Sequence, residues 1–472
     1  MPPTIRIDDL LAVTGGRLQA TTSVTTFAGA SVDSRRVTPG SLFVALPGER
    51  TDGHAFLADA VAAGAVAALV SRPVERPVER PVERPAGSDV AVVEVPDTLV
   101  ALQELAAWWR RRHAVRVVGI TGSTGKTVAK EIVADVVARA FTTLRNEGNL
   151  NSETGLPMTL LRLEPAHEVA VLEMSMYTIG EIARLAEIAE PEIGVVLAVH
   201  PTHLERAGSI ERIARAKAEL PMALPPDGLA VLNADDPRVA AMRDVTAAEV
   251  RTFGLSPVAD VRASDIASRG LAGTEFTLHA PWGERRLRSG TPGRHLVPHA
   301  LAATIVADRL GVPSDEVAAA LERGSRAPHR MEVRAGSSGA TVVDDTYNAS
   351  PVSVAAALAF LGETPVAAGG RRIAVLGDML ELGPEEEALH REIGATAAGM
   401  VDALVAVGPR GRWIADAART AGLGTVLEAD DAEAAADVLE RDLAPGRSDL
   451  VLVKGSRGVE LDRTVDRIVE PR

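Results

Sequence analysis

Short apolar runs separated by helical stretches dominate the chain from about residue 111 to its C-terminus. The runs lack the apolar–polar alternation of a half-exposed strand, so each run reads as a strand buried on both faces. Buried strands with helices between them indicate parallel sheets covered by helices. The runs are VRVVGI, EVAVLEM, IGVVLAV, RRIAVLGD, ALVAVG, TVLEAD and DLVLVKGS.

The length and the restart of this pattern predict the domain organisation. A chain of 472 residues is too long for one ordinary core and suggests about three domains. We expect a small N-terminal α/β domain over residues 1–107 and a central parallel-sheet domain with a phosphate loop over 108–328. A Rossmann-like domain follows over 329–472, where strands and helices alternate again. The predicted fold class is therefore α/β in three domains.

The composition excludes several classes of function. A formal net charge of −14 argues against binding duplex nucleic acid, which needs a basic face. The absence of cysteine excludes disulfides, thiolate catalysis and cysteine zinc sites, and it suits a reducing cytoplasm. The chain shows no secretory signal and no long apolar stretch that would span a membrane. We expect a cytoplasmic monomer that acts on small molecules.

A four-residue repeat, RPVERPVERPVERP, runs from Arg72 to Pro85. Proline at every fourth position is incompatible with a helix and with a ladder strand. The repeat lies between the strand-like runs VAALVS and VAVVEV, so we predict an exposed, stiff hairpin extension. A docking arm is the functional alternative to a tolerated loop expansion.

The segment TGSTGKT lies between a predicted strand and a predicted helix and resembles a phosphate-binding loop. Ile120 occupies the first-glycine position of the strict pattern, so the loop is a shorter variant. Its glycines let backbone N–H groups face a phosphate, while the lysine reaches outer oxygens and the threonine ligates Mg²⁺. The residues expected to contact the nucleotide are Gly122, Ser123, Thr124, Gly125, Lys126 and Thr127.

Further polar residues follow neighbouring strands of the central domain. Glu173 ends one strand, His203 follows the next, and Lys217 lies on the helix after it. Ligands of open parallel sheets gather at the carboxyl ends of the strands, where these side chains would meet Thr127. Each residue alone reads as a solvated group, but together they favour two Mg²⁺ ions, one on Thr127 and one on Glu173 and His203.

The C-terminal unit shows the same coincidence. Asp378 and Lys454 each follow a predicted strand, and so does a cluster that comprises Asp344, Asp345, Tyr347 and Asn348. Tyr177, the other of the chain's two tyrosines, follows Glu173, where base stacking and a capping or core role both remain open. Two α/β units with polar ends facing each other would form a closing cleft.

Segments that match one known family extend over nearly the whole chain. In the N-terminal part the matching segment is SVDSRRVTPGSLFVALPGERTDGHAF. In the centre the segments are TGSTGKT, EGNLNSETGLPMTLL, EMSM, THLERAGSIERIARAKAEL and LPPDGLAVLNADDPR, and at the C-terminal end they are DDTYNASP, LGDMLELG, ALHREIG and LVKGS. On these residues the chain resembles the Mur ligase family.

The resemblance implies a role for each matching position. The residues implied in ATP and Mg²⁺ binding are Lys126, Thr127, Glu173 and His203, with Lys217 matching the lysine that the family carbamylates. The residues implied to reach ATP from the C-terminal domain are Arg330, Asp345, Tyr347 and Asn348. The residues implied in substrate binding are Ser34 and Arg35 at the uridine end and Asn149 and Asn151 near the muramoyl group. The catalytic set would be Lys126, Lys217, His203 and Arg330.

The activity that the resemblance implies is ATP-dependent amide-bond formation through an acyl phosphate, in peptidoglycan precursor synthesis. The C-terminal motifs point to UDP-N-acetylmuramoyl-tripeptide and D-alanyl-D-alanine as substrates. Departures from the family pattern occur at Leu296, Leu197 and Ala198, and His200 is added. A sibling ligase with another amine substrate and a nucleotide-binding protein without ligase activity therefore remain alternatives.

Overall fold

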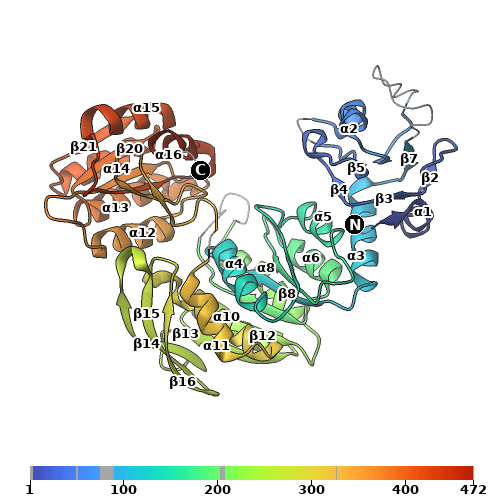
Figure 1. Ribbon diagram of the computed structural model, residues 1–472, viewed down its shortest axis with the longest axis horizontal. Coiled ribbons are helices and arrows are strands. Elements are labelled where there is room, and N and C mark those ends of the chain that lie inside the picture. The colour runs from blue at the N-terminus through green and yellow to red at the C-terminus, as the bar shows by residue number, and fades with distance from the viewer. Residues whose placement is uncertain (1–3, 49–50, 75–89, 202–207, 326, 471–472) are drawn as a thin grey trace.

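The computed structural model describes residues 4–48, 51–74, 90–201, 208–325 and 327–470. Figure 1 shows three lobes that follow one another in chain order, with the central lobe between the N-terminal and C-terminal ones. Within the described ranges, no helix is long and apolar enough to cross a membrane. The three-domain α/β expectation is confirmed at the level of architecture.

The N-terminal lobe is built on a mixed sheet with the strand order β2-β7-β6-β5-β4 and a small β1-β3 pair. The strands are β1 (Ile5–Arg6), β2 (Arg17–Leu18), β3 (Thr26–Phe27), β4 (Ala30–Ser31), β5 (Leu42–Val44), β6 (Ala67–Val70) and β7 (Ala91–Glu94). The helices are α1 (Ile7–Thr14), α2 (Leu57–Ala63) and α3 (Thr98–Arg111).

The hairpin prediction for the repeat is wrong. Strands β6 and β7, which flank it, pair in parallel with Ala67 opposite Ala91. Parallel neighbours cannot be joined by a hairpin turn, because the chain has to return to the starting edge of the sheet. From Glu75 onward the repeat lies outside the described residues.

Helix α3 connects the N-terminal lobe to the central one. Asp97 caps its first turn by accepting hydrogen bonds from the amides of Leu99 and Val100. Apolar residues of α3 belong to one continuous core with β5 of the N-terminal sheet and with helices α5 (Gly155–Leu160) and α6 (Glu181–Ala189) of the central lobe. The predicted boundary at residue 107 therefore falls inside this helix.

The central sheet has the strand order β16-β15-β14-β13-β12-β11-β8-β10-β9. Its strands are β8 (Arg116–Thr121), β9 (Thr143–Arg145), β10 (Val169–Glu173), β11 (Ile193–Val196), β12 (Leu229–Asn233), β13 (Glu249–Gly254), β14 (Val261–Ser268), β15 (Thr274–Ala280) and β16 (Gly283–Ser289). The pairs from β9 to β14 are parallel, as predicted. One face carries α4 (Lys126–Val137), α10 (Val297–Leu310) and α11 (Ser314–Arg323), and the other carries α5, α6 and α8 (Ile210–Met222).

The antiparallel extension β14-β15-β16 was not predicted. Along β15, buried and partly exposed residues alternate, because only one face of this part of the sheet is covered. A search for continuous apolar runs misses such strands. The short α9 (Pro237–Ala240) follows β12 in the same lobe.

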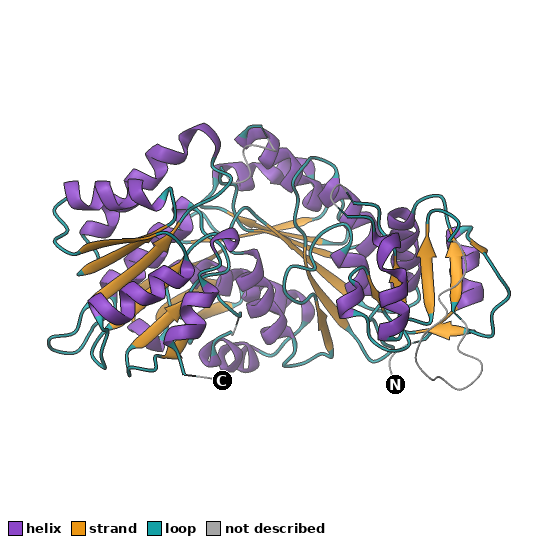
Figure 2. Cartoon of the chain, turned by 90° about the horizontal axis from the view of Figure 1, so that it is seen from above, coloured by secondary structure: helices purple, strands orange, loops and turns teal. Residues whose placement is uncertain are grey.

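The C-terminal lobe has the strand order β17-β18-β22-β19-β20-β21, parallel except for β17. Its strands are β17 (Glu332–Ala335), β18 (Thr341–Asp344), β19 (Arg372–Gly377), β20 (Ala403–Val407), β21 (Val426–Ala429) and β22 (Leu450–Lys454). Helices α12 (Pro351–Glu363), α13 (Glu386–Ala398) and α14 (Gly411–Thr420) cover one face, and α15 (Ala432–Val438) and α16 (Asp462–Ile468) cover the other. Seen from above, strands flanked by helices are plain in this lobe (Figure 2).

The register of the central sheet brings three strand ends to one level. Glu173 of β10 lies opposite Ile120 of β8, and Val196 of β11 lies opposite Thr121. The segments that leave these strands therefore start side by side at the carboxyl edge of the sheet, where a ligand of a parallel sheet binds.

Candidate active site

The phosphate loop follows β8 and runs directly into α4. Gly125 has a φ of 77°, in the left-handed region, and a Cβ at this position would overlap the His299 imidazole. Glycine is therefore required here by both the backbone and its neighbour. Helix α4 begins at Lys126, so its free N–H groups and the positive end of its dipole face the loop.

Lys126 lies across this loop. Its Nζ donates a hydrogen bond of 2.9 Å to the Gly122 carbonyl oxygen. Burial lowers the pKa of the ammonium, the Glu173 carboxylate opposes that shift, and the Arg330 charge adds to it. The lysine is thus held against the phosphate loop, and its predicted contact with an outer phosphate oxygen stays a prediction.

The carboxylate of Glu173 is buried at the end of β10 and is hydrogen-bonded on both oxygens. Thr127 Oγ1 donates to Oε2 at 2.8 Å, and Asn151 Nδ2 donates to Oε1 at 2.6 Å. The expected meeting of Thr127 and Glu173 is therefore present, and the two side chains belong to one site. His203, the third member of that expectation, lies outside the described residues.

The donor set at this point suits Mg²⁺ that arrives with a nucleotide. In the described ranges, no group of three or more histidine, aspartate or glutamate side chains forms a metal cage. Thr127 and Glu173 nevertheless supply a hydroxyl and a carboxylate oxygen beside the phosphate loop. Mg²⁺ takes such hard oxygens, usually one or two from carboxylates and the rest from phosphates and water.

Lys217 lies on α8 and is only 3% exposed. Burial lowers the pKa of its amine well below the ordinary value, and the nearby Lys126 charge lowers it further. A lowered pKa favours the neutral form of a lysine, and the neutral amine is a nucleophile.

Two residues of the C-terminal lobe, Arg330 and Tyr347, also lie near the phosphate-loop site. The Arg330 guanidinium carbon lies 4.1 Å from the centroid of the Tyr347 ring. Burial raises the pKa of the Tyr347 phenol, the Arg330 charge opposes the shift, and the Glu173 carboxylate adds to it. Arg330 Nε is buried and has no hydrogen-bond partner in the described part of the chain. Both side chains therefore lie within electrostatic reach of the phosphate-loop site.

Asp345 anchors the segment that carries these two residues. Lys454 Nζ donates to Asp345 Oδ2 at 2.6 Å and to the Asn348 carbonyl oxygen at 2.9 Å, and the Met331 amide donates to Asp345 Oδ1 at 3.2 Å. The carboxylate is thus engaged within its own lobe, and the C-terminal loop is held as one unit.

Two of the polar residues singled out in the sequence, Ser123 and Asp378, make contacts within the protein. The Ser123 amide donates to the Ala198 carbonyl oxygen at 2.8 Å, and the Ser123 hydroxyl bonds to both the amide and the carbonyl of His200. Ser123 therefore connects the phosphate loop to the segment after β11, and its predicted contact with a nucleotide stays a prediction. Asp378 accepts hydrogen bonds from the amides of Arg410 and Gly411 and so caps α14.

The expected substrate residues are separated in the structure. Ser34 and Arg35 lie in the N-terminal lobe, where Arg35 forms an ion pair with Asp33 at 2.8 Å. Asn149 is exposed on the segment after β9, whereas Asn151 contacts Glu173. Thr124 lies half-buried in the phosphate loop as expected.

Two histidines near the start of α10, His295 and His299, were not predicted as site residues. Burial lowers the pKa of His299 to about 4, with a further contribution from His295, and neither ring nitrogen has a partner among the described residues. Burial also lowers the pKa of His295 to about 4, while the Asp345 carboxylate opposes that shift. The departure at Leu296 was noted, but its side chain packs in the core and the histidines flank it.

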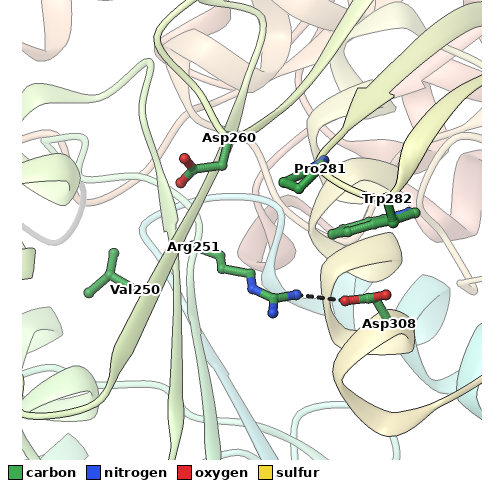
Figure 3. Close-up of a pocket in the computed structure, with 6 residues that line it drawn as sticks. All are labelled: Val250, Arg251, Asp260, Pro281, Trp282 and Asp308. Atoms are coloured by element: carbon green, nitrogen blue, oxygen red, sulfur yellow. Dashed lines mark hydrogen bonds and ion pairs between the residues drawn. The ribbon is translucent and has the colours of Figure 1, made fainter.

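A hollow of about 420 Å³ lies elsewhere on the central lobe (Figure 3). Its Arg251 guanidinium is already paired with Asp308 at 2.6 Å and with Glu249 at 2.8 Å. Trp282 forms part of the wall and is partly exposed. The hollow involves none of the phosphate-loop residues, so the site at the strand ends is the better candidate.

Comparison with family models places this site in a known context. Residues 120–307 match the Mur ligase middle domain, residues 329–457 match the glutamate ligase domain of Mur ligases, and residues 26–110 match the catalytic domain of the Mur ligase family. The chain belongs to the Mur ligase family. Both the phosphate loop and the Glu173 site lie within the segment that matches the Mur ligase middle domain.

Named Mur ligases are similar to the chain over nearly its whole length. The UDP-N-acetylmuramoyl-tripeptide--D-alanyl-D-alanine ligase of Mycobacterium tuberculosis is 41% identical over 468 residues, which cover 93% of this chain and 91% of that protein. The ligase of the same name from Escherichia coli is 36% identical over 471 residues, which cover 99% and 98%.

Solved structures of Mur ligases are also similar to the chain over nearly its whole length. MurF from Acinetobacter baumannii superposes with a TM-score of 0.85 at 30% identity and covers 98% of both chains. MurF from Thermotoga maritima, solved in complex with ADP, superposes with a TM-score of 0.77 at 29% identity and covers 93% of this chain and 96% of that one.

Proposed function

We propose that this Mur ligase joins D-alanyl-D-alanine to UDP-N-acetylmuramoyl-tripeptide at the cost of ATP, in peptidoglycan precursor synthesis. The observation that carries the proposal is the buried Thr127–Glu173 hydrogen bond beside Lys126 at the carboxyl edge of the central sheet. The names of the relatives at 36–41% identity supply the substrates.

The chemistry requires an activated carboxylate, because an oxide is a poor leaving group. An oxygen of the tripeptide carboxylate attacks the γ-phosphorus, the bond to the β-phosphate oxygen breaks, and ADP leaves. The D-alanyl-D-alanine amine then attacks the acyl carbon, inorganic phosphate leaves, and the amine loses a proton. Both steps build negative charge on oxygen atoms, so cations placed beforehand lower their barriers.

Residues of the chain have distinct parts in this scheme. Lys126 and the amides at the start of α4 hold the phosphate tail, and Arg330 adds a positive charge from the C-terminal lobe. Thr127 and Glu173 would hold Mg²⁺, which supplies Lewis-acid stabilisation of the phosphate oxygens. Approach of the C-terminal lobe would keep water from the acyl phosphate.

Lys217 would act as a carbamate in the same site. Its lowered pKa favours the neutral amine, whose nitrogen would form a bond to the carbon of CO₂ and release a proton, giving a carbamate with anionic oxygen atoms. This would convert a buried neutral amine beside Lys126 into an anionic group that attracts a metal ion.

Release of ADP is the direct test. We expect it only when UDP-N-acetylmuramoyl-tripeptide and D-alanyl-D-alanine are both present, and equal turnover with either omitted would overturn the proposal. A panel of amines would identify a sibling ligase. Tight ATP binding without any product would favour a nucleotide-binding protein that has lost ligase activity, which the departures at Leu296 and Ala198 motivate.

We further propose that the chain works as a cytoplasmic monomer with domains over 1–107, 108–328 and 329–472, in which the first boundary lies within the shared helix α3. The lack of cysteine suits a reducing compartment. Cell fractionation and light scattering of the purified protein test the compartment and the monomer.

A further inference from the structure

Asn146 lies just beyond the edge strand β9 and is 1% exposed. The β9–β10 ladder ends with Arg145 opposite Val171. Beyond that point the Asn146 carboxamide takes the place of a strand: its Oδ1 accepts from the Glu173 amide at 3.0 Å, and its Nδ2 donates to the Glu173 carbonyl oxygen at 3.0 Å. One side chain thus forms both hydrogen bonds that a neighbouring backbone would form.

The same carboxamide also holds the segment that follows. Asn146 Nδ2 donates a second hydrogen bond of 2.9 Å to the Leu150 carbonyl oxygen. The next residue, Asn151, is the one whose side chain contacts Glu173 Oε1. Asn146 therefore fixes the backbone of Glu173 and the position of its amide partner together.

A buried lysine of the phosphate-loop helix fixes Asn146 in turn. Lys130 lies on α4, one turn after Lys126 and Thr127, and its side chain is fully buried. Its Nζ donates to the Asn146 carbonyl oxygen at 2.5 Å and forms an ion pair with Glu131 at 2.6 Å. The helix that carries Thr127 and the strand that carries Glu173 are thus connected through Asn146.

We propose that Asn146 is a positioning residue that sets the direction of the Glu173 carboxylate. Glu173 is the last residue of β10, so the sheet holds it through β8 on one side only. On the other side Asn146 alone supplies the missing pair. Loss of the carboxamide would leave the buried backbone groups of Glu173 unpaired and free the carboxylate to turn away from Thr127.

This inference rests on the proposed role of Glu173 as a Mg²⁺ ligand. Residues that orient a metal ligand typically change metal affinity by about 10- to 100-fold when they are mutated. The effect of Asn146 should therefore appear in the Mg²⁺-dependent part of nucleotide binding, whereas contacts of the phosphate loop alone should be unchanged.

The test measures ADP binding to the full chain by calorimetry, with Mg²⁺ and with EDTA. For Asn146→Ala we expect the gain in affinity on adding Mg²⁺ to fall by about tenfold or more, and affinity in EDTA to stay within about twofold. Leu144→Ala is the matched control, because Leu144 is buried in β9, two residues before Asn146, and lies opposite Ala170 in the sheet. Leu144→Ala should lower the melting temperature but leave the increase in ADP affinity on adding Mg²⁺ unchanged.

The outcomes separate this inference from the proposed function. If Glu173→Gln leaves the Mg²⁺ gain unchanged, the proposed metal role of Glu173 fails and this inference fails with it. If Glu173→Gln removes the gain and Asn146→Ala keeps it, only the positioning role is overturned. If Asn146→Ala does not fold, Asn146→Gln answers the same question. Glutamine keeps the carboxamide donor and acceptor but places them one methylene farther from the backbone, so the increase in ADP affinity on adding Mg²⁺ should still be smaller than in the unmodified protein.

Discussion

Replacing Thr127 by valine tests the centre of the site, because valine keeps the shape and removes only the hydroxyl. The hydroxyl donates to the Glu173 carboxylate at 2.8 Å, and both residues are buried. A hydrogen bond to a charged group contributes about 1.5–3 kcal/mol, since its loss leaves a buried acceptor short of a donor. Asn151 still donates to the other oxygen, which favours the lower half of this range.

The same change removes a proposed Mg²⁺ ligand. If the lost interaction acts in the transition state with the same 1.5–3 kcal/mol, kcat/KM falls by about 10- to 150-fold. The assay is ADP release with both substrates at several Mg²⁺ concentrations, together with urea unfolding of the free protein. Thr127→Ser keeps a hydroxyl and should stay within a few-fold of the unmodified protein.

Equal rates and equal stability for Thr127→Val and the unmodified protein would refute the reasoning. If Thr127→Val is less stable but reacts at the same rate, the hydrogen bond is a structural contact and Thr127 has no part in the reaction.

The remaining predictions concern other groups. Lys217→Ala should abolish ADP release, and millimolar acetate or formate should restore part of it by replacing the carbamate; no rescue, together with no CO₂ adduct in the mass of the intact protein, would exclude the carbamate. Arg330→Ala should lower kcat/KM by at least tenfold while Arg330→Lys retains more, because the cation that lies over Tyr347 is kept; equal losses in both would point to stacking geometry instead of charge. His390 accepts the Met379 N–H at 2.9 Å on Nε2, and burial lowers its pKa, so the folded state favours the neutral ring. The contribution of His390 to the free energy of unfolding should be complete above the unfolded pKa of about 6.5 and should be lost as the pH falls below that value. Urea unfolding at pH 7.5 and pH 5 should therefore show a smaller pH-dependent difference in the free energy of unfolding for His390→Gln than for the unmodified protein.

The strand pattern was predictable because the buried parallel strands are continuous apolar runs. Strands β8, β10 and β11 of the central lobe and β19, β20 and β22 of the C-terminal lobe were expected from such runs. Strand β21 was expected as well, but it lies at the edge of its sheet and its residues are partly exposed, so the expectation that it is buried on both faces is wrong. The phosphate loop was predictable for a related reason, since its glycines and lysine are adjacent in sequence. The register of the sheet then brought Glu173 beside Thr127 as expected.

Residues whose role no motif or strand end indicates were not predictable. Asn146 pairs with Glu173 across 27 positions, and nothing in the local sequence distinguishes it from a loop asparagine. The position of His299 beside Gly125 depends on how α10 packs against the phosphate loop, which the local sequence does not indicate. The parallel pairing of β6 and β7 likewise depends on the path of the whole chain, so a proline-rich insertion between two runs could not reveal it.

Helix α3 has a mechanical consequence. Trp109 donates its indole N–H to the Leu163 carbonyl oxygen at 3.1 Å, and Arg110 donates to the Ala189 carbonyl oxygen at 2.8 Å, so the helix is fastened to the central lobe while its other face fills the N-terminal core. Two lobes that share a core travel as one rigid piece. Opening and closing would then fall to the C-terminal lobe alone, which would swing Arg330 and Tyr347 toward and away from a stationary platform.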